Sequence, residues 1–228
     1  STNIITGIIH TMKEYDASEL MLGLHRKTNI ADSFFGSIGD TLLKGTHRQI
    51  MIIKCLIPPN TFRRIVVAVP PKAEYEVGFY KWVRHLCRIT SMLGCRLHFY
   101  AHPHTLKYLE GFVAHKFDNI NAAYSELEKW EDLLLLTGEV NYDQLLVIIS
   151  ARPGFISYDS SFENLPHQIA KYFNNNSLMM IYPEQNGDPL EIPPSSFLAT
   201  NHPEHIKKVN TRLYNQVINW INNQIKKV

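Results

Sequence analysis

Cysteine is scarce in this sequence, and the short motifs of common enzyme classes are missing. The 228 residues include only three cysteines, and no two of them form a CxxC pair. An odd number of cysteines in apolar surroundings argues against a disulfide framework and predicts reduced core thiols in a cytosolic protein, at Cys55, Cys87 and Cys95. The sequence also contains no GxSxG, no P-loop and no HExxH. We therefore expect a protein that is not an enzyme.

Excess charge and long apolar runs are also missing. Lys and Arg number 23 and Asp and Glu number 21, so the formal net charge is only +2, which predicts no binding to nucleic acid. No apolar run approaches the roughly 20 residues of a membrane-spanning helix. With 228 residues, 45% of them hydrophobic, the chain can bury the core of one or two ordinary domains.

An internal repeat predicts the architecture. At a constant offset of 127 residues, Tyr15-Asp16 falls on Tyr142-Asp143, and Asp32-Ser33 falls on Asp159-Ser160. The apolar runs 20–22 and 51–53 fall on the apolar runs 147–149 and 178–180. Because apolar pattern and polar punctuation keep the same register, two copies of a strand–loop–helix–strand unit explain the sequence better than chance.

The copies differ in what precedes them. The run 63–69 reads as a buried parallel strand, followed by helical spacing over 79–93, a cap at Gly94 and a strand over 96–101. The first copy has no such lead-in, so we expect it to be truncated and completed by strands further upstream in a longer parent chain. With a linker at Pro58-Pro59-Asn60, the predicted domains are 1–57, 62–184 and a tail, 185–228.

The remaining elements follow from periodicity. We expect an opening helix with Ile4, Ile5, Ile8, Ile9 and Met12 on its apolar face, strands over 19–23, 49–56 and 144–150, and helices over 33–44 and 122–136. A short helix is expected around 108–113. In the tail, a final helix from about Pro203 presents an apolar face, and we expect it to pack on its own domain or to bind a partner or a membrane surface. That face consists of Ile206, Val209, Leu213, Val217, Trp220 and Ile221.

The first copy contains a candidate phosphate cradle. A strand ends at Gly23, a polar loop follows, and Gly36-Ser37 opens a helix. Glycine lets the backbone turn sharply and lets a ligand approach the main chain, and a helix N-terminus favours an anion. The candidate nucleotide-binding residues are Gly23, Arg26, Gly36, Ser37 and Ile38.

This stretch resembles the universal stress protein family, which carries Gly, two residues, Gly, nine residues, then Gly-Ser or Gly-Thr. Gly23 and Gly36-Ser37 match, whereas Arg26 stands at the second glycine and could neutralise a phosphate or block its pocket. The resemblance implies a Rossmann-like α/β fold with parallel sheets and helices on both faces. It also implies a site for ATP or another adenine nucleotide.

The second copy departs from the family pattern. Ser150, Pro153 and Glu163-Asn164 stand at the glycine positions, and Pro70 replaces an Asp that touches the nucleotide in the family. A glutamate at a helix N-terminus repels phosphate. We therefore expect the second copy to serve as a scaffold that does not bind ATP in the family's manner.

A tandem with one degenerate half is similar to the cytosolic C-terminal tail of bacterial monovalent cation:proton antiporters. The segments RRIVVAVPPKAE (63–74) and GLHRKTNIADSFFGSIGD (23–40) carry this likeness. It implies an upstream transmembrane transport domain, a location at the cytoplasmic face of the inner membrane, and a sensor that biases the transporter. The alternatives are a free-standing tandem stress protein that binds ATP, and an assembly module that binds no small molecule.

Two further expectations concern assembly and metal. The last strands of the two copies, 49–56 and 178–182, could pair within one chain or between two chains, and a homodimer through edge strands is expected. The histidines of the HxxxHxH pattern, His98, His102 and His104, alternate along a strand and enter a loop. Metal binding needs their imidazoles to converge, so we expect loop and surface histidines and no metal site.

Overall fold

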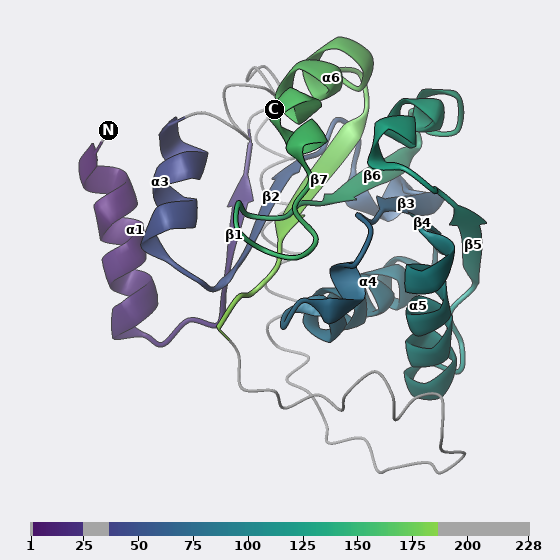
Figure 1. Ribbon diagram of the computed structural model, residues 1–228, viewed down its shortest axis with the longest axis horizontal. Helices are drawn as coiled ribbons and strands as arrows, with labels where there is room; N and C mark the ends of the chain where they lie inside the picture. Colours follow the sequence, from purple (N-terminus) through teal and green to yellow (C-terminus); the bar gives the residue numbers. More distant parts are fainter. Residues whose placement is uncertain (1, 25–36, 187–228) are drawn as a thin grey trace.

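The computed structural model describes residues 2–24 and 37–186, and every structural statement below concerns these residues. Figure 1 shows a central sheet with α4 (Phe79–Leu93) and α5 (Pro103–Lys116) on one side and α6 (Leu165–Tyr172) on the other. The helices α1 (Thr2–Glu14) and α3 (Ser37–Gly45) lie beside the first strands and pack on the same face of the sheet as α6.

Seven strands form one sheet in the order β1-β2-β7-β6-β3-β4-β5. All neighbours are parallel except β2 and β7, which are antiparallel. The strands are β1 (Glu19–Gly23), β2 (Gln49–Lys54), β3 (Arg64–Ala68), β4 (Arg96–Ala101), β5 (Ala122–Glu126), β6 (Gln144–Ile149) and β7 (Ser177–Tyr182). The central strands are continuous apolar runs because side chains on both faces are buried under helices.

Two apolar clusters fill the space between the sheet and its helices. On one face, Val67 and Phe99 pack with Trp82 of α4 and its neighbours. On the other face, Ile148 and Met180 are in the cluster that includes helical residues of α1, α3 and α6. The predicted α/β, Rossmann-like fold with helices on both faces is therefore confirmed.

The repeat is visible as two matching units. The unit β1-α3-β2 corresponds to β6-α6-β7, each with two parallel strands joined by a helix. The pairing registers differ by two residues, since Glu19 pairs with Gln49, whereas Leu145 pairs with Ser177. An even shift leaves every side chain on its original face of the sheet, so the apolar pattern survives.

The halves join through their last strands, within one chain. Ile52 of β2 lies opposite Met180 of β7 in the antiparallel pair. The predicted linker falls on the short 3-10 helix η1 (Pro59–Thr61), where the chain passes from β2 to β3. Because both halves contribute to one sheet, the division into separate domains stays a prediction.

The second half has the complete strand order of a doubly wound sheet, and the first half has part of it. Counted within the second half, the order β5-β4-β3-β6-β7 is 3-2-1-4-5, which reverses direction between β3 and β6. In the first half, β1 is the strand that corresponds to β6. It lies at the end of the sheet, with β2 as its strand neighbour among the described residues.

The prediction of a helix over 122–136 is wrong. Residues 122–126 form the edge strand β5, paired with β4, and a 3-10 helix, η3 (Trp130–Gly138), follows. Leu127, Trp130, Leu133 and Leu136 are buried at a spacing of three residues, which suits the three residues per turn of a 3-10 helix. The helix expected at 108–113 is longer, since α5 starts at Pro103. Ile4 is 71% exposed and does not join the core face of α1.

Candidate functional site

The first-half loop leaves the sheet where the sequence predicts it. Gly23 ends β1 and is exposed, and the Leu24 amide donates to the carbonyl oxygen of Ile53 at 2.8 Å. Because β1 and β2 are parallel, α3, which begins at Ser37, must start at the edge where β1 ends. Arg26 and Gly36 lie outside the described residues, as do the side chains of Ser37 and Ile38. The nucleotide site therefore stays a prediction.

A lysine that the sequence analysis did not single out lies at this edge. Lys54 is the last residue of β2, and only 4% of it is exposed. Strand alternation places it on the same face as Ile50 and Ile52, which pack with Leu42 of α3. Burial lowers the pKa of Lys54. The sequence feature that could have pointed to Lys54 is a single cation at the end of the apolar run 50–53.

The corresponding position in the second half is closed. The carboxyl ends of β3 and β6 meet there, at the reversal of strand order where doubly wound sheets hold ligands. Glu76 Oε1 instead accepts bonds from the Ser157 amide at 3.0 Å and the Ser157 hydroxyl at 2.7 Å. A cavity of about 10 Å³ remains beside them, which is the space of roughly one water. A nucleotide does not fit there.

Arg152, in the loop after β6, is used to join the halves. Its guanidinium donates to the carbonyl oxygens of Leu43 at 2.8 Å, Arg48 at 3.0 Å, and also Thr46. These carbonyls belong to the last turn of α3 and the chain after it, where a cation satisfies unpaired acceptors and the helix dipole. Burial lowers the pKa of Arg152 to about 10. This arginine therefore serves the interface between the halves.

Glu184, after β7, forms a second link between the halves. Its Oε1 lies 3.3 Å from Arg48 Nη1, and its Oε2 lies 2.5 Å from Lys81 Nζ on α4. Arg48 also pairs with Asp16 at 2.7 Å. The backbone of Glu184 packs on Gly78, where an added Cβ would lie 2.6 Å from the Glu184 nitrogen.

A third link pairs Glu19 of β1 with His85 of α4. The distance from His85 Nδ1 to Glu19 Oε2 is 3.0 Å, and the Gln49 side-chain amide lies within 3.0 Å of the same ring nitrogen. Burial alone would raise the pKa of Glu19, but the hydrogen bond and charge of His85, helped by Lys81, outweigh it and lower that pKa. Strand pairing and these three links connect the two halves.

The histidines of the HxxxHxH pattern do not converge. His98 Nε2 lies 2.8 Å from Ser125 Oγ, the His102 ring caps α5 by accepting from the His104 amide, and His104 Nδ1 lies 2.7 Å from Glu74 Oε1. Among the described residues, no cluster of three His, Cys, Asp or Glu side chains could hold a metal ion.

The Ser125–His98 pair is unsuited to nucleophilic catalysis. Arg64 Nη1 approaches His98 Nδ1 at 3.4 Å, and since arginine only donates, Nδ1 must accept. This contact favours the neutral tautomer whose proton lies on Nε2 and is directed at Ser125, and in that tautomer the ring does not accept the serine proton. Burial, with the charge of Arg64, lowers the pKa of His98 and keeps the ring neutral.

A second hollow lies between α5 and β5. Its volume is about 400 Å³, and Glu110, Asp118, Phe117 and Tyr124 are among its lining residues. Two carboxylates and no cation among the residues that line it disfavour a phosphate there.

Comparison with known proteins found distant similarity to solved structures. No family model matches the chain, and no curated protein matches it. Among solved structures, it is similar to a universal stress protein from Archaeoglobus fulgidus DSM 4304, with 12% identity and a TM-score of 0.49, covering 80% of this chain and 65% of that one. It is also similar to a protein described as a universal stress protein from Pseudomonas aeruginosa UCBPP-PA14, with 15% identity and a TM-score of 0.46, covering 78% of this chain and 67% of that one. This chain thus spans less than two thirds of the archaeal protein.

Proposed function

We propose that this chain is the cytosolic regulatory domain of a cation:proton antiporter and that its first half binds an adenine nucleotide at the loop between Gly23 and Ser37. The observation that carries the proposal is a difference between two equivalent positions, the segment after β1 and the segment after β6. The second-half position is closed by the Glu76–Ser157 contact, whereas β1 ends in an exposed glycine followed by a helix N-terminus.

The links between the halves suit a sensor. A ligand can bias a transporter only if it binds one of its states more tightly than the other. Arg152 of the second half donates to a carbonyl oxygen at the end of α3, so a shift of α3 on ligand binding would alter a contact with the second half. The antiporter itself rests on the likeness of segments 23–40 and 63–74 to antiporter tails. Among the described residues, no helix is long and apolar enough to cross a membrane.

Calorimetric titration of ATP against the full parent protein tests the nucleotide site. Gly36→Asp should weaken binding at least about tenfold, because a carboxylate then occupies the place of a phosphate at the start of α3. The matched control is Asn164→Asp, which adds the same charge at the residue directly before α6 and should leave the affinity within about twofold.

Two results would count against this proposal. Absence of saturable heat with the unaltered protein would leave an assembly module without ligand. Saturable binding without any effect of ATP on cation flux in proteoliposomes would remove the antiporter role and favour a free-standing nucleotide-binding protein.

A further inference from the structure

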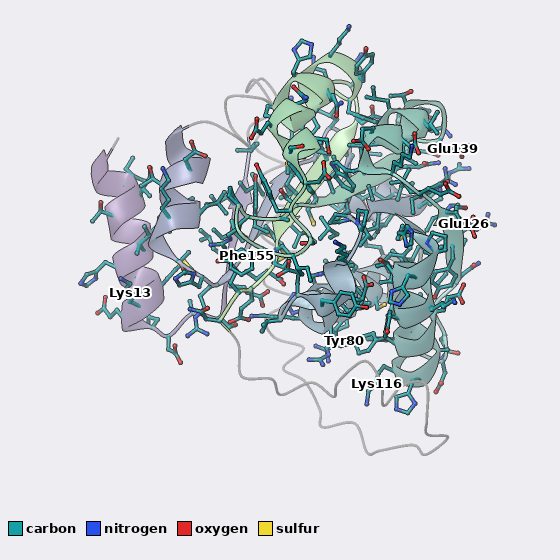
Figure 2. The ribbon with its side chains drawn as sticks, in the orientation of Figure 1. Lys13, Tyr80, Lys116, Glu126, Glu139 and Phe155 are labelled. Atoms are coloured by element: carbon teal, nitrogen blue, oxygen red, sulfur yellow. The ribbon has the colours of Figure 1, made fainter. Side chains whose placement is uncertain are left out.

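Two loops at the reversal point of the second half expose four large apolar side chains. Tyr75 is 52% exposed, Val77 53%, Phe155 37% and Ile156 55%. Figure 2 marks Phe155 on the loop that follows β6. Tyr75 and Val77 flank Glu76, and Phe155 and Ile156 precede Ser157, so the Glu76–Ser157 bonds hold together the two segments that carry these side chains. We call these four side chains the apolar patch.

The apolar patch lies where the described chain ends. Gln185 is held by its amide, which donates to the His47 carbonyl at 2.9 Å, and by its side chain, 3.1 Å from His47 Nδ1. Gln185 and Phe155 line the same small cavity. The segment that follows residue 186 therefore starts beside the apolar patch.

That following segment carries the matching chemistry in its sequence. From Pro203 onward, apolar residues recur at helical spacing, from Ile206 to Ile221 with Trp220 among them. The sixteen residues 187–202 can span up to roughly 50 Å when extended, at about 3.3 Å per residue, so the apolar patch is within reach.

We propose that the apolar patch is the docking site of residues 203–228 of the same chain. Four side chains, each about half exposed, offer on the order of 300 Å² of apolar surface. Stable complexes between separate molecules bury about 800 Å² on each partner, and the apolar patch is smaller than that. A tethered segment is held at an effective concentration of around millimolar, so a weak contact suffices to keep it bound. This inference is independent of the nucleotide site.

Amide hydrogen exchange on the full chain tests the proposal. Peptides from 203–228 should exchange at least about tenfold more slowly than expected for an unprotected chain. The double variant Phe155→Ser with Ile156→Ser should abolish that protection. Both residues are surface loop residues, and an unchanged thermal midpoint verifies that the variant folds. The matched control is Leu135→Ser, which removes another exposed apolar side chain, 71% exposed, from η3 and should keep the protection.

Fluorescence gives an independent readout. Trp82 and Trp130 are buried, and Trp220 lies in the proposed docking segment. Subtracting the spectrum of Trp220→Phe isolates the Trp220 emission, which should shift to longer wavelength in the Phe155/Ile156 double variant.

Three outcomes would overturn the proposal. In the first, residues 203–228 are unprotected, or equally protected in the double variant. In the second, protection rises with protein concentration, which identifies a second copy as the occupant. In the third, protection arises only with vesicles of phosphatidylglycerol and phosphatidylethanolamine, which identifies a membrane surface as the partner.

Discussion

Arg152 and Leu43 are 109 residues apart in the sequence, yet the Arg152 guanidinium donates to the Leu43 carbonyl oxygen at 2.8 Å. The arginine comes from the loop after β6, and the carbonyl comes from the last turn of α3. One side chain of the second half thus satisfies the end of a helix in the first half. The β2–β7 pair makes the sheet continuous across the repeat, and the Arg152–Leu43 contact adds a second connection between the halves.

Removing this arginine should destabilise the protein strongly. Arg152→Ala leaves the part-buried carbonyl oxygens of Leu43, Thr46 and Arg48 without the donor that Arg152 supplies, so we expect a loss of about 3 kcal/mol in the free energy of unfolding. Urea denaturation measures it. The control is Arg63→Ala, whose side chain is 84% exposed and pairs with Asp143, and which should cost less than about 1 kcal/mol. Equal losses for the two variants would contradict the role given to Arg152.

The Glu19–His85 pair should make stability depend on acid pH. The pKa of Glu19 is lower in the folded protein than its usual 4.5, so the unfolded chain takes up the proton first. The stabilisation from the Glu19–His85 pair is therefore complete at pH values above 4.5. It is lost as the pH falls through the lowered pKa of Glu19 in the folded protein. Between pH 6 and pH 3, the unaltered protein should lose more stability than Glu19→Gln. Parallel loss in both proteins, measured by urea denaturation at each pH, would contradict the pairing.

Local signals explain what the sequence predicted well. The strand at 19–23 and the helix at 79–93 are predicted with their observed bounds, because a short apolar run that ends at Gly23 marks the strand, and apolar residues at helical spacing followed by Gly94 mark the helix. Gly94, with a φ of 62°, ends α4 as a helix-capping glycine does. The parallel units also followed from the repeat, whose polar and apolar positions keep register.

Long-range contacts explain what the sequence did not predict. Residues 122–136 have helical propensity and spacing, but 122–126 gain more by hydrogen bonding to β4 at the edge of the sheet. The Glu76–Ser157 contact spans 81 residues and leaves no local mark in the sequence. For the first-half loop, the glycine at the strand end was located correctly, and Lys54 beside it was missed because burial cannot be inferred from residue type alone.

Two of the cysteines should resist thiol reagents in the folded protein. Burial raises the pKa of Cys87 to about 12 and that of Cys95 to about 11. The thiolate, which is the reactive form, is then on the order of 0.01% of Cys87 and 0.1% of Cys95 at pH 8. Mass spectrometry after brief treatment with iodoacetamide should show both unlabelled until a denaturant is added. Rapid labelling of Cys87 without denaturant would contradict its burial.

Two glycines should respond in opposite directions to the same substitution. At Gly78, an added Cβ would lie 2.6 Å from the Glu184 nitrogen and 2.7 Å from its oxygen, and backbone atoms cannot rotate away. Gly78→Ala should therefore cost about 1–3 kcal/mol of unfolding free energy. At Gly7, inside α1, an added Cβ meets nothing within 4 Å, and alanine is the better helix former. Gly7→Ala should therefore gain about 0.5–1 kcal/mol. Urea denaturation of the two variants side by side measures both signs, and a gain at Gly78 would show that α4 and the chain after β7 are not packed as closely as described.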